Sequence, residues 1–106
     1  MRLGKAAADA KGWIGGPWNW DLPVAIGYGN EGHDEPHRHK RQTEVYLVAS
    51  GSAVAFVDDA EVALVAGDVL VVEPYEVRTF TASSPDYRCF VLLFGGDGSS
   101  DKVLMD

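Results

Sequence analysis

Apolar and polar residues alternate in short runs along most of this chain, and turn-forming residues separate the runs. A period of two is typical of half-buried strands, whereas a helix needs a 3.6-residue period with capping residues at its ends. No stretch has the helical pattern over any length, and only residues 2–11 could form a short helical turn. The pattern therefore predicts an all-β protein.

Seven runs have the length and the β-branched or aromatic composition of strands: residues 22–28, 43–49, 53–57, 61–65, 69–73, 76–82 and 86–94. Gly29-Asn30-Glu31-Gly32 is a turn signal after the first run, and Asp58-Asp59-Ala60 predicts a hairpin. Many short strands at even spacing indicate a sandwich or barrel. We expect one domain over residues 1–106, with an N-terminal extension (1–21), a barrel core (22–94) and a flexible tail (95–106).

Composition is that of a compact globular domain and argues against a nucleic-acid partner. The chain has 106 residues, 46% of them hydrophobic and 24% charged, with a formal net charge of -7 and a pI near 4.7. The one basic cluster, Arg38, Lys40 and Arg41, is expected to solvate a loop. No apolar run is long enough for a signal peptide or a membrane span, so we expect a cytoplasmic protein. The single cysteine, Cys89, lies in an apolar run and is expected to be a buried, inert thiol.

The most informative residues are two histidines and a glutamate. His37 and His39 occupy positions i and i+2, so on an extended segment both side chains project from the same face. Glu44 opens the next apolar run, and a short loop could bring its carboxylate to the imidazoles. Such a set suits Zn, Fe, Mn, Co or Ni. The alternative is a solvated loop, because basic residues flank both histidines.

This segment resembles the first motif of the cupin superfamily, G-x5-H-x-H-x3,4-E-x6-G. Two histidines, a glutamate and the closing glycine are in register: His37, His39, Glu44 and Gly51. The opening glycine is displaced, since Glu31 stands in its place and Gly32 follows it. The resemblance implies a jelly-roll β-barrel with a metal site, and it favours a homodimer that pairs through sheet edges.

Residues 67–82 resemble the second cupin motif, G-x5-P-x-G-x2-H-x3-N, less closely. Gly67 fits, and so does Asp68, which often follows that glycine in the family. The motif proline, glycine, histidine and asparagine are replaced by Glu73, Tyr75, Arg78 and Ala82. In the family the histidine is the fourth metal ligand, and arginine cannot replace it because a guanidinium has no acceptor lone pair. The chain is thus expected to lack one ligand.

Arg78 leaves two outcomes open. A unit charge about 5 Å from a dication costs up to about 6–7 kcal/mol at an effective dielectric near 20. Arg78 could therefore occupy the metal position and pair with Glu44, giving a metal-free pocket. Alternatively, Fe, Mn, Ni or Zn remains on His37, His39 and Glu44, and Arg78 holds an anionic substrate by a bidentate contact. Alternation places Arg78 on the same face as Phe80, which is expected to line the barrel.

Three functions remain possible from the sequence. The first is a metal-assisted reaction on a small, anionic molecule, with Arg78, Tyr46 and Phe80 as substrate-binding residues. The second is a metal-free binding or sensor barrel in which Arg78 pairs with Glu44. The third is a metal-free isomerase or epimerase, with His37 or His39 as general base and Tyr46 or Tyr75 as acid. The resemblance does not select a reaction.

Two further features have several interpretations. Trp13, Trp18 and Trp20 lie among glycines and a proline, which predicts an ordered loop or an irregular edge strand rather than a helix. Their side chains could close one end of the barrel, line a ligand pocket or form a dimer contact. His33 could supply the missing ligand, although its glycine-flanked position favours exposure to solvent.

Overall fold

The strands follow the predicted runs closely, with three short additions. The computed structural model describes residues 1–6, 11–32, 34–95 and 101–105. Its strands are β1 (Gly12–Gly15), β2 (Val24–Gly29), β3 (His37–His39), β4 (Thr43–Ser50), β5 (Ser52–Val57), β6 (Ala60–Val65), β7 (Val69–Val72), β8 (Arg78–Ser83), β9 (Arg88–Phe94) and β10 (Lys102–Leu104). The additions are β1, β3 and β10.

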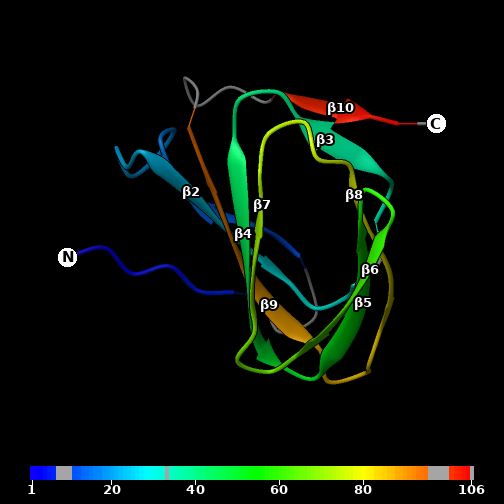
Figure 1. Ribbon diagram of the computed structural model, residues 1–106. Helices are drawn as coiled ribbons and strands as arrows, with labels where there is room; N and C mark the ends of the chain where they lie inside the picture. The colour runs from blue at the N-terminus through cyan, green and yellow to red at the C-terminus, as the bar shows by residue number, and fades with distance from the viewer. Residues whose placement is uncertain (7–10, 33, 96–100, 106) are drawn as a thin grey trace.

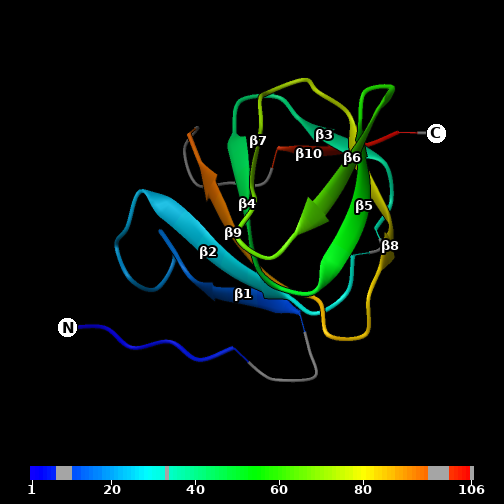
Figure 2. The same ribbon diagram turned by 60° about the horizontal axis from the view of Figure 1, so that its bottom comes forward.

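These strands form two antiparallel sheets that face each other as a barrel (Figure 1 and, turned by 60°, Figure 2). The first sheet has the order β1-β2-β9-β4-β7, and the second has the order β10-β3-β8-β5-β6. This arrangement confirms the predicted all-β, jelly-roll architecture. Among the described residues no helix is long and apolar enough to cross a membrane.

Both ends of the chain contribute strands to this barrel. Near the N-terminus, β1 pairs with β2 through a register shift between Trp13 and Gly15, as expected of an irregular edge strand. Near the C-terminus, β10 pairs with β3, with Lys102 opposite His39. Residues 2–6 form no helical turn, and residues 7–10, where the rest of that expected turn falls, lie outside the described part of the chain.

Strict alternation along β4 gives the first sheet two different faces. Glu44, Tyr46 and Val48 are buried and point into the barrel, whereas Val45 and Leu47 lie on the outer face. The core of the barrel forms where the inner faces of the two sheets meet: Tyr46, Val48, Ala53, Ala55, Leu64, Val72, Phe80, Tyr87 and Cys89. The same inward positions of β3 and β4 place polar side chains at one end of this core.

The backbone at the motif positions explains part of the family pattern. Gly51 has φ +72°, and an added Cβ would lie 2.7 Å from the backbone nitrogen of Tyr87, so glycine is required twice over. Tyr75 replaces the second motif's internal glycine and still has φ +69°. The turn thus has a left-handed conformation at Tyr75, although a residue with a Cβ adopts it less readily than glycine.

Candidate metal centre in the barrel

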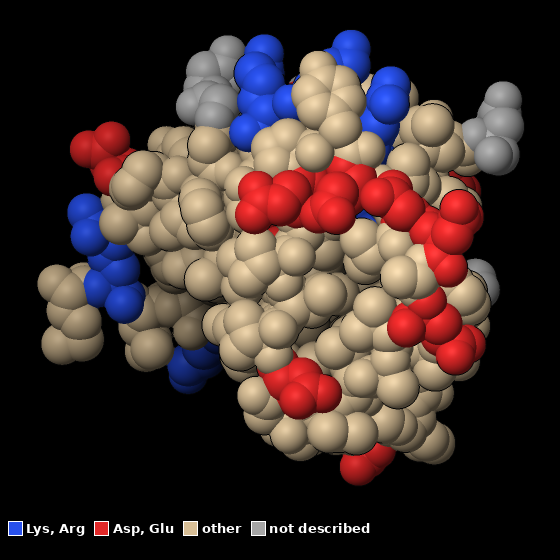
Figure 3. Space-filling view, in the orientation of Figure 1, with Lys and Arg blue, Asp and Glu red and all other residues tan. Residues whose placement is uncertain are grey.

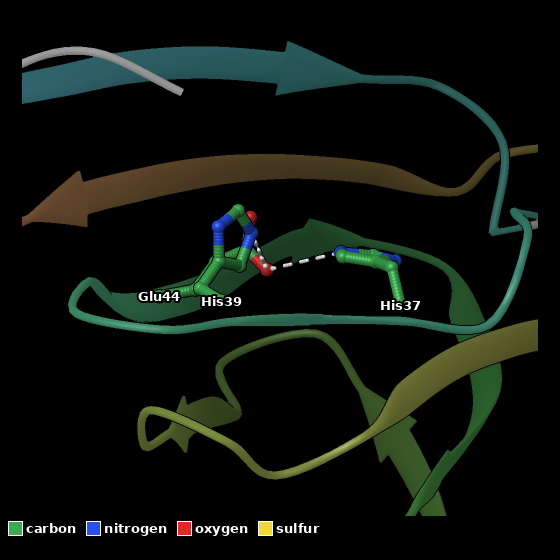
Figure 4. Close-up of side chains that lie close together, drawn as sticks. All are labelled: His37, His39 and Glu44. Atoms are coloured by element: carbon green, nitrogen blue, oxygen red, sulfur yellow. Dashed lines mark ion pairs between the residues drawn. The ribbon is translucent and has the colours of Figure 1, made fainter. Parts of the chain in front are cut away.

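His37, His39 and Glu44 meet inside the barrel, and all three are buried. Because β3 is extended, both imidazoles project from its inner face, toward the first residues of β4 (Figure 4). The Nε2 atoms of His37 and His39 each lie 3.8 Å from Oε1 of Glu44. This distance is too long for a hydrogen bond. The three atoms that could ligate a metal therefore surround a space without hydrogen-bonding to one another across it.

The opposite ring nitrogen of each histidine is fixed by an acceptor. Nδ1 of His37 lies 2.9 Å from the backbone oxygen of Glu35, which can only accept a hydrogen bond. Nδ1 of His39 lies 2.8 Å from a carboxylate oxygen of Asp101. Both rings are therefore held with a proton on Nδ1, which leaves the lone pair on Nε2 facing Glu44. Fixing a ring through its far nitrogen is how proteins orient imidazole ligands for metals.

Asp101 is the residue that sequence reasoning missed. It is buried, and its second carboxylate oxygen accepts the backbone N–H groups of Arg41 at 2.6 Å and Gln42 at 3.1 Å. Burial alone would raise its pKa, but these N–H groups and His39 hold the pKa below its usual value. No local signal marks Asp101, because it lies 62 residues after His39 in what reads as a flexible tail.

Four groups converge on one oxygen of Glu44. The Tyr46 hydroxyl donates to Oε1 at 2.5 Å, and Nε of Arg78 lies 3.6 Å from the same atom. Burial raises the pKa of Glu44, but His37, Tyr46, His39 and Arg78 together hold the pKa below its usual value, so the carboxylate is charged. Burial and the Glu44 charge raise the pKa of Tyr46 well above its ordinary value, so its hydroxyl stays protonated.

Arg78 lies behind Glu44 rather than in the cavity. It is fully buried, and Nη2 donates to the backbone oxygens of Val72 at 3.3 Å and Glu73 at 3.5 Å. Within the described residues, its Nε and Nη1 atoms make no hydrogen bond. The guanidinium thus compensates the charge of Glu44 without forming a fork with it.

The donor set fits a divalent transition metal. The three donor atoms lie within 4.8 Å of one another. Two ligands about 2.1 Å from one ion at tetrahedral angles lie about 3.4 Å apart, so the widest pair would have to approach by up to about 1.4 Å. Two neutral imidazoles and a carboxylate are a ligand set with positions left for other molecules. His37, His39 and Glu44 could therefore hold a metal ion, whose identity this set does not select.

A cavity of about 810 Å³ opens from this centre along the inner face of the first sheet. Tyr46 and Phe80 both line it, with ring centroids 4.9 Å apart, whereas Arg78 and Tyr75 are not among its lining residues. Gln42 also lines it, and its buried side-chain oxygen has no hydrogen-bond partner among the described residues. The cavity thus offers an apolar wall and a polar inner end.

Cys89 is buried and lines the cavity, and burial raises the pKa of its thiol, so it stays protonated. His33 lies outside the described residues.

On the surface, Lys and Arg gather at the top of the view, near β3 and β10, above a band of acidic side chains (Figure 3).

Comparison with known proteins agrees with this architecture. Residues 27–94 match the family model of the cupin domain, and the chain belongs to the cupin family. No curated protein sequence matches the chain.

Several solved structures share the fold at low sequence identity. The nucleoside dehydratase Pac13 from Streptomyces is 16% identical, with a TM-score of 0.70 over 98% of this chain and 92% of that one; a variant of it was solved with uridine. A cupin protein from Bacteroides fragilis is 22% identical, with a TM-score of 0.66 over the whole of both chains. KdgF from Halomonas is 16% identical, with a TM-score of 0.68 over 83% of this chain and 79% of that one.

The contact between Arg78 and Glu44 yields a prediction about stability. Replacing Arg78 with Met leaves the Glu44 charge buried without its cation, so we expect the free energy of unfolding to fall by about 3–5 kcal/mol. The double variant Arg78→Met/Glu44→Gln should recover most of that loss, because it buries no charge. Urea unfolding monitored by tryptophan fluorescence measures both. A loss below about 1 kcal/mol for Arg78→Met would show that Glu44 does not depend on this cation.

Proposed function

We propose that the protein binds a small, anionic molecule in its barrel beside a divalent transition metal held by His37, His39 and Glu44. The observation that carries this proposal is the fixed orientation of the two histidines. Both rings carry their proton on Nδ1, held by Glu35 and Asp101, and both Nε2 lone pairs point at the Glu44 carboxylate. Two lone pairs aimed at a negative charge repel it, and a metal cation between them would turn that repulsion into attraction.

The residues around such an ion would have different roles. A bound dication would supply Lewis-acid charge to an oxygen of the bound molecule. Tyr46 donates to Glu44 and keeps one carboxylate oxygen oriented, while Arg78 balances its charge from behind. The unpartnered side-chain oxygen of Gln42 would accept a hydrogen bond from a hydroxyl or amine of the ligand.

Charge supports an anionic ligand. With Glu44 and Arg78 cancelling each other, a bound dication would leave the inner end of the cavity positive, and the histidines are neutral in their ligating form. The comparison with Pac13 adds that a barrel of this architecture takes up a molecule as large as uridine. The identity of the ligand and of any reaction is not set by these residues.

One observation favours a second candidate, a metal-free centre. Nε of Arg78 lies 3.6 Å from the same Glu44 oxygen that a metal would need, and Tyr46 already donates to that oxygen. In such a centre His37 or His39 could act as a general base and Tyr46 as an acid on a bound molecule. A metal-free binding or sensor barrel would have the same arrangement of Arg78, Glu44 and Tyr46 before it binds its ligand.

Metal content distinguishes the two candidates. Protein purified without affinity tag or chelator, incubated with Mn(II), Fe(II), Ni(II) or Zn(II) and desalted, should contain about one ion per chain by ICP-MS. His37→Ala and Glu44→Gln should lose it, because each removes one of three ligands. Glu31→Gln is the matched control, since Glu31 lines the far part of the same cavity and is exposed. Less than about a tenth of an ion in wild type would favour the metal-free centre.

Arg78→His tests the alignment of the second motif in the same assay. It removes the cation that opposes a metal and adds an imidazole, so metal affinity should rise by at least about tenfold. An unchanged affinity would mean that position 78 does not correspond to the fourth ligand position of the family.

A further inference from the structure

Two of the three tryptophans lie on the cavity wall rather than in the core. Trp13 and Trp18 both line the cavity, and they are 52% and 56% exposed. Their rings make an edge contact, with centroids 6.3 Å apart and planes at 77°. Exposing half of two neighbouring indoles to solvent is unfavourable, so these rings are surfaces on which something else is expected to pack.

Glycines hold both rings in place from behind. A Cβ on Gly27 would lie 3.0 Å from the Trp13 ring, and a Cβ on Gly16 would lie 2.5 Å from the Trp18 ring. Each indole thus rests directly on backbone, and Gly27 lies opposite Trp13 in the β1–β2 pairing. A ring fixed in this way loses little further freedom when a ligand packs on it.

We propose that Trp13 and Trp18 form a stacking platform for a flat ring, and that the ligand is a planar ring bearing a carboxylate or a similar anionic group. This proposal rests on the proposed function, which places the anionic group at His37, His39 and Glu44. Apolar residues of the same wall, Ala25, Val91 and Leu93, connect the platform to that centre along the inner face of the first sheet. One molecule would touch both ends.

A pair of acids with the same charge and different ring shape tests the platform. Isothermal titration of the metal-loaded protein should show benzoate binding about 3- to 10-fold more tightly than cyclohexanecarboxylate, because only benzoate presents a π face. Trp13→Leu and Trp18→Leu should each reduce this ratio toward one. Trp20→Leu is the matched control, because Trp20 packs on Gly4 and Gly15 and does not line the cavity. Circular dichroism during a urea titration checks that each variant is folded in the absence of urea and unfolds cooperatively.

The outcomes separate the platform from the metal centre. His37→Ala should weaken both acids alike and leave their ratio unchanged. Equal binding of the two acids by wild type, or a ratio that survives both cavity tryptophan variants, overturns the platform. A preserved ratio with no dependence of affinity on metal or on His37 supports the platform and overturns the proposed metal centre. Absence of binding by either acid overturns the platform, while the metal content measured by ICP-MS decides the metal centre independently.

Discussion

The charge on Glu44 is the constraint on which the rest of this barrel's interior depends. A buried carboxylate is strongly unfavourable unless other groups compensate it, and here the Tyr46 hydroxyl donates to one carboxylate oxygen while Nε of Arg78 lies 3.6 Å from the same atom. Backbone oxygens at the end of β7 hold the guanidinium, while the nearby imidazoles are held by the backbone oxygen of Glu35 and by Asp101. The polar groups of the interior are therefore arranged around the Glu44 carboxylate, and the apolar core packs beside them.

This arrangement gives Arg78 a different role from the one its sequence position suggests. Period-two alternation correctly places it on the buried face with Phe80, yet its long side chain turns to the carbonyl oxygens at the end of β7. It thus stabilises the carboxylate from behind, while Tyr46 and Phe80 contact the cavity. A change from histidine to arginine in the second motif can therefore keep Glu44 charged while it removes one metal ligand.

The inner face of the first sheet connects the two parts of the candidate site. Its inward side chains line the cavity between the tryptophan platform and the candidate metal centre. Because neighbouring residues on a strand point to opposite faces, alternate residues of β2, β9 and β4 face this cavity.

Much of this could be predicted from the sequence, and the exceptions have physical reasons. Alternation identifies the strands and places His37 with His39 and Glu44 with Tyr46, because the period of a strand is local information. Asp101 could not be predicted, since it reaches His39 only through the pairing of β10 with β3. The lining position of Trp13 depends on the pairing of β1 with β2, and the end point of the Arg78 side chain depends on side-chain torsions that no pattern encodes.

The central claim is that both imidazoles present an unprotonated Nε2 to Glu44. Long-range ¹⁵N–¹H correlation NMR of the metal-free protein near neutral pH reports the protonation of each ring nitrogen directly. We expect His37 and His39 both to carry the proton on Nδ1, and Asp101→Asn to disturb His39 alone. A proton on Nε2 of either ring would contradict the account, because that nitrogen would then donate to Glu44 instead of presenting a lone pair to it.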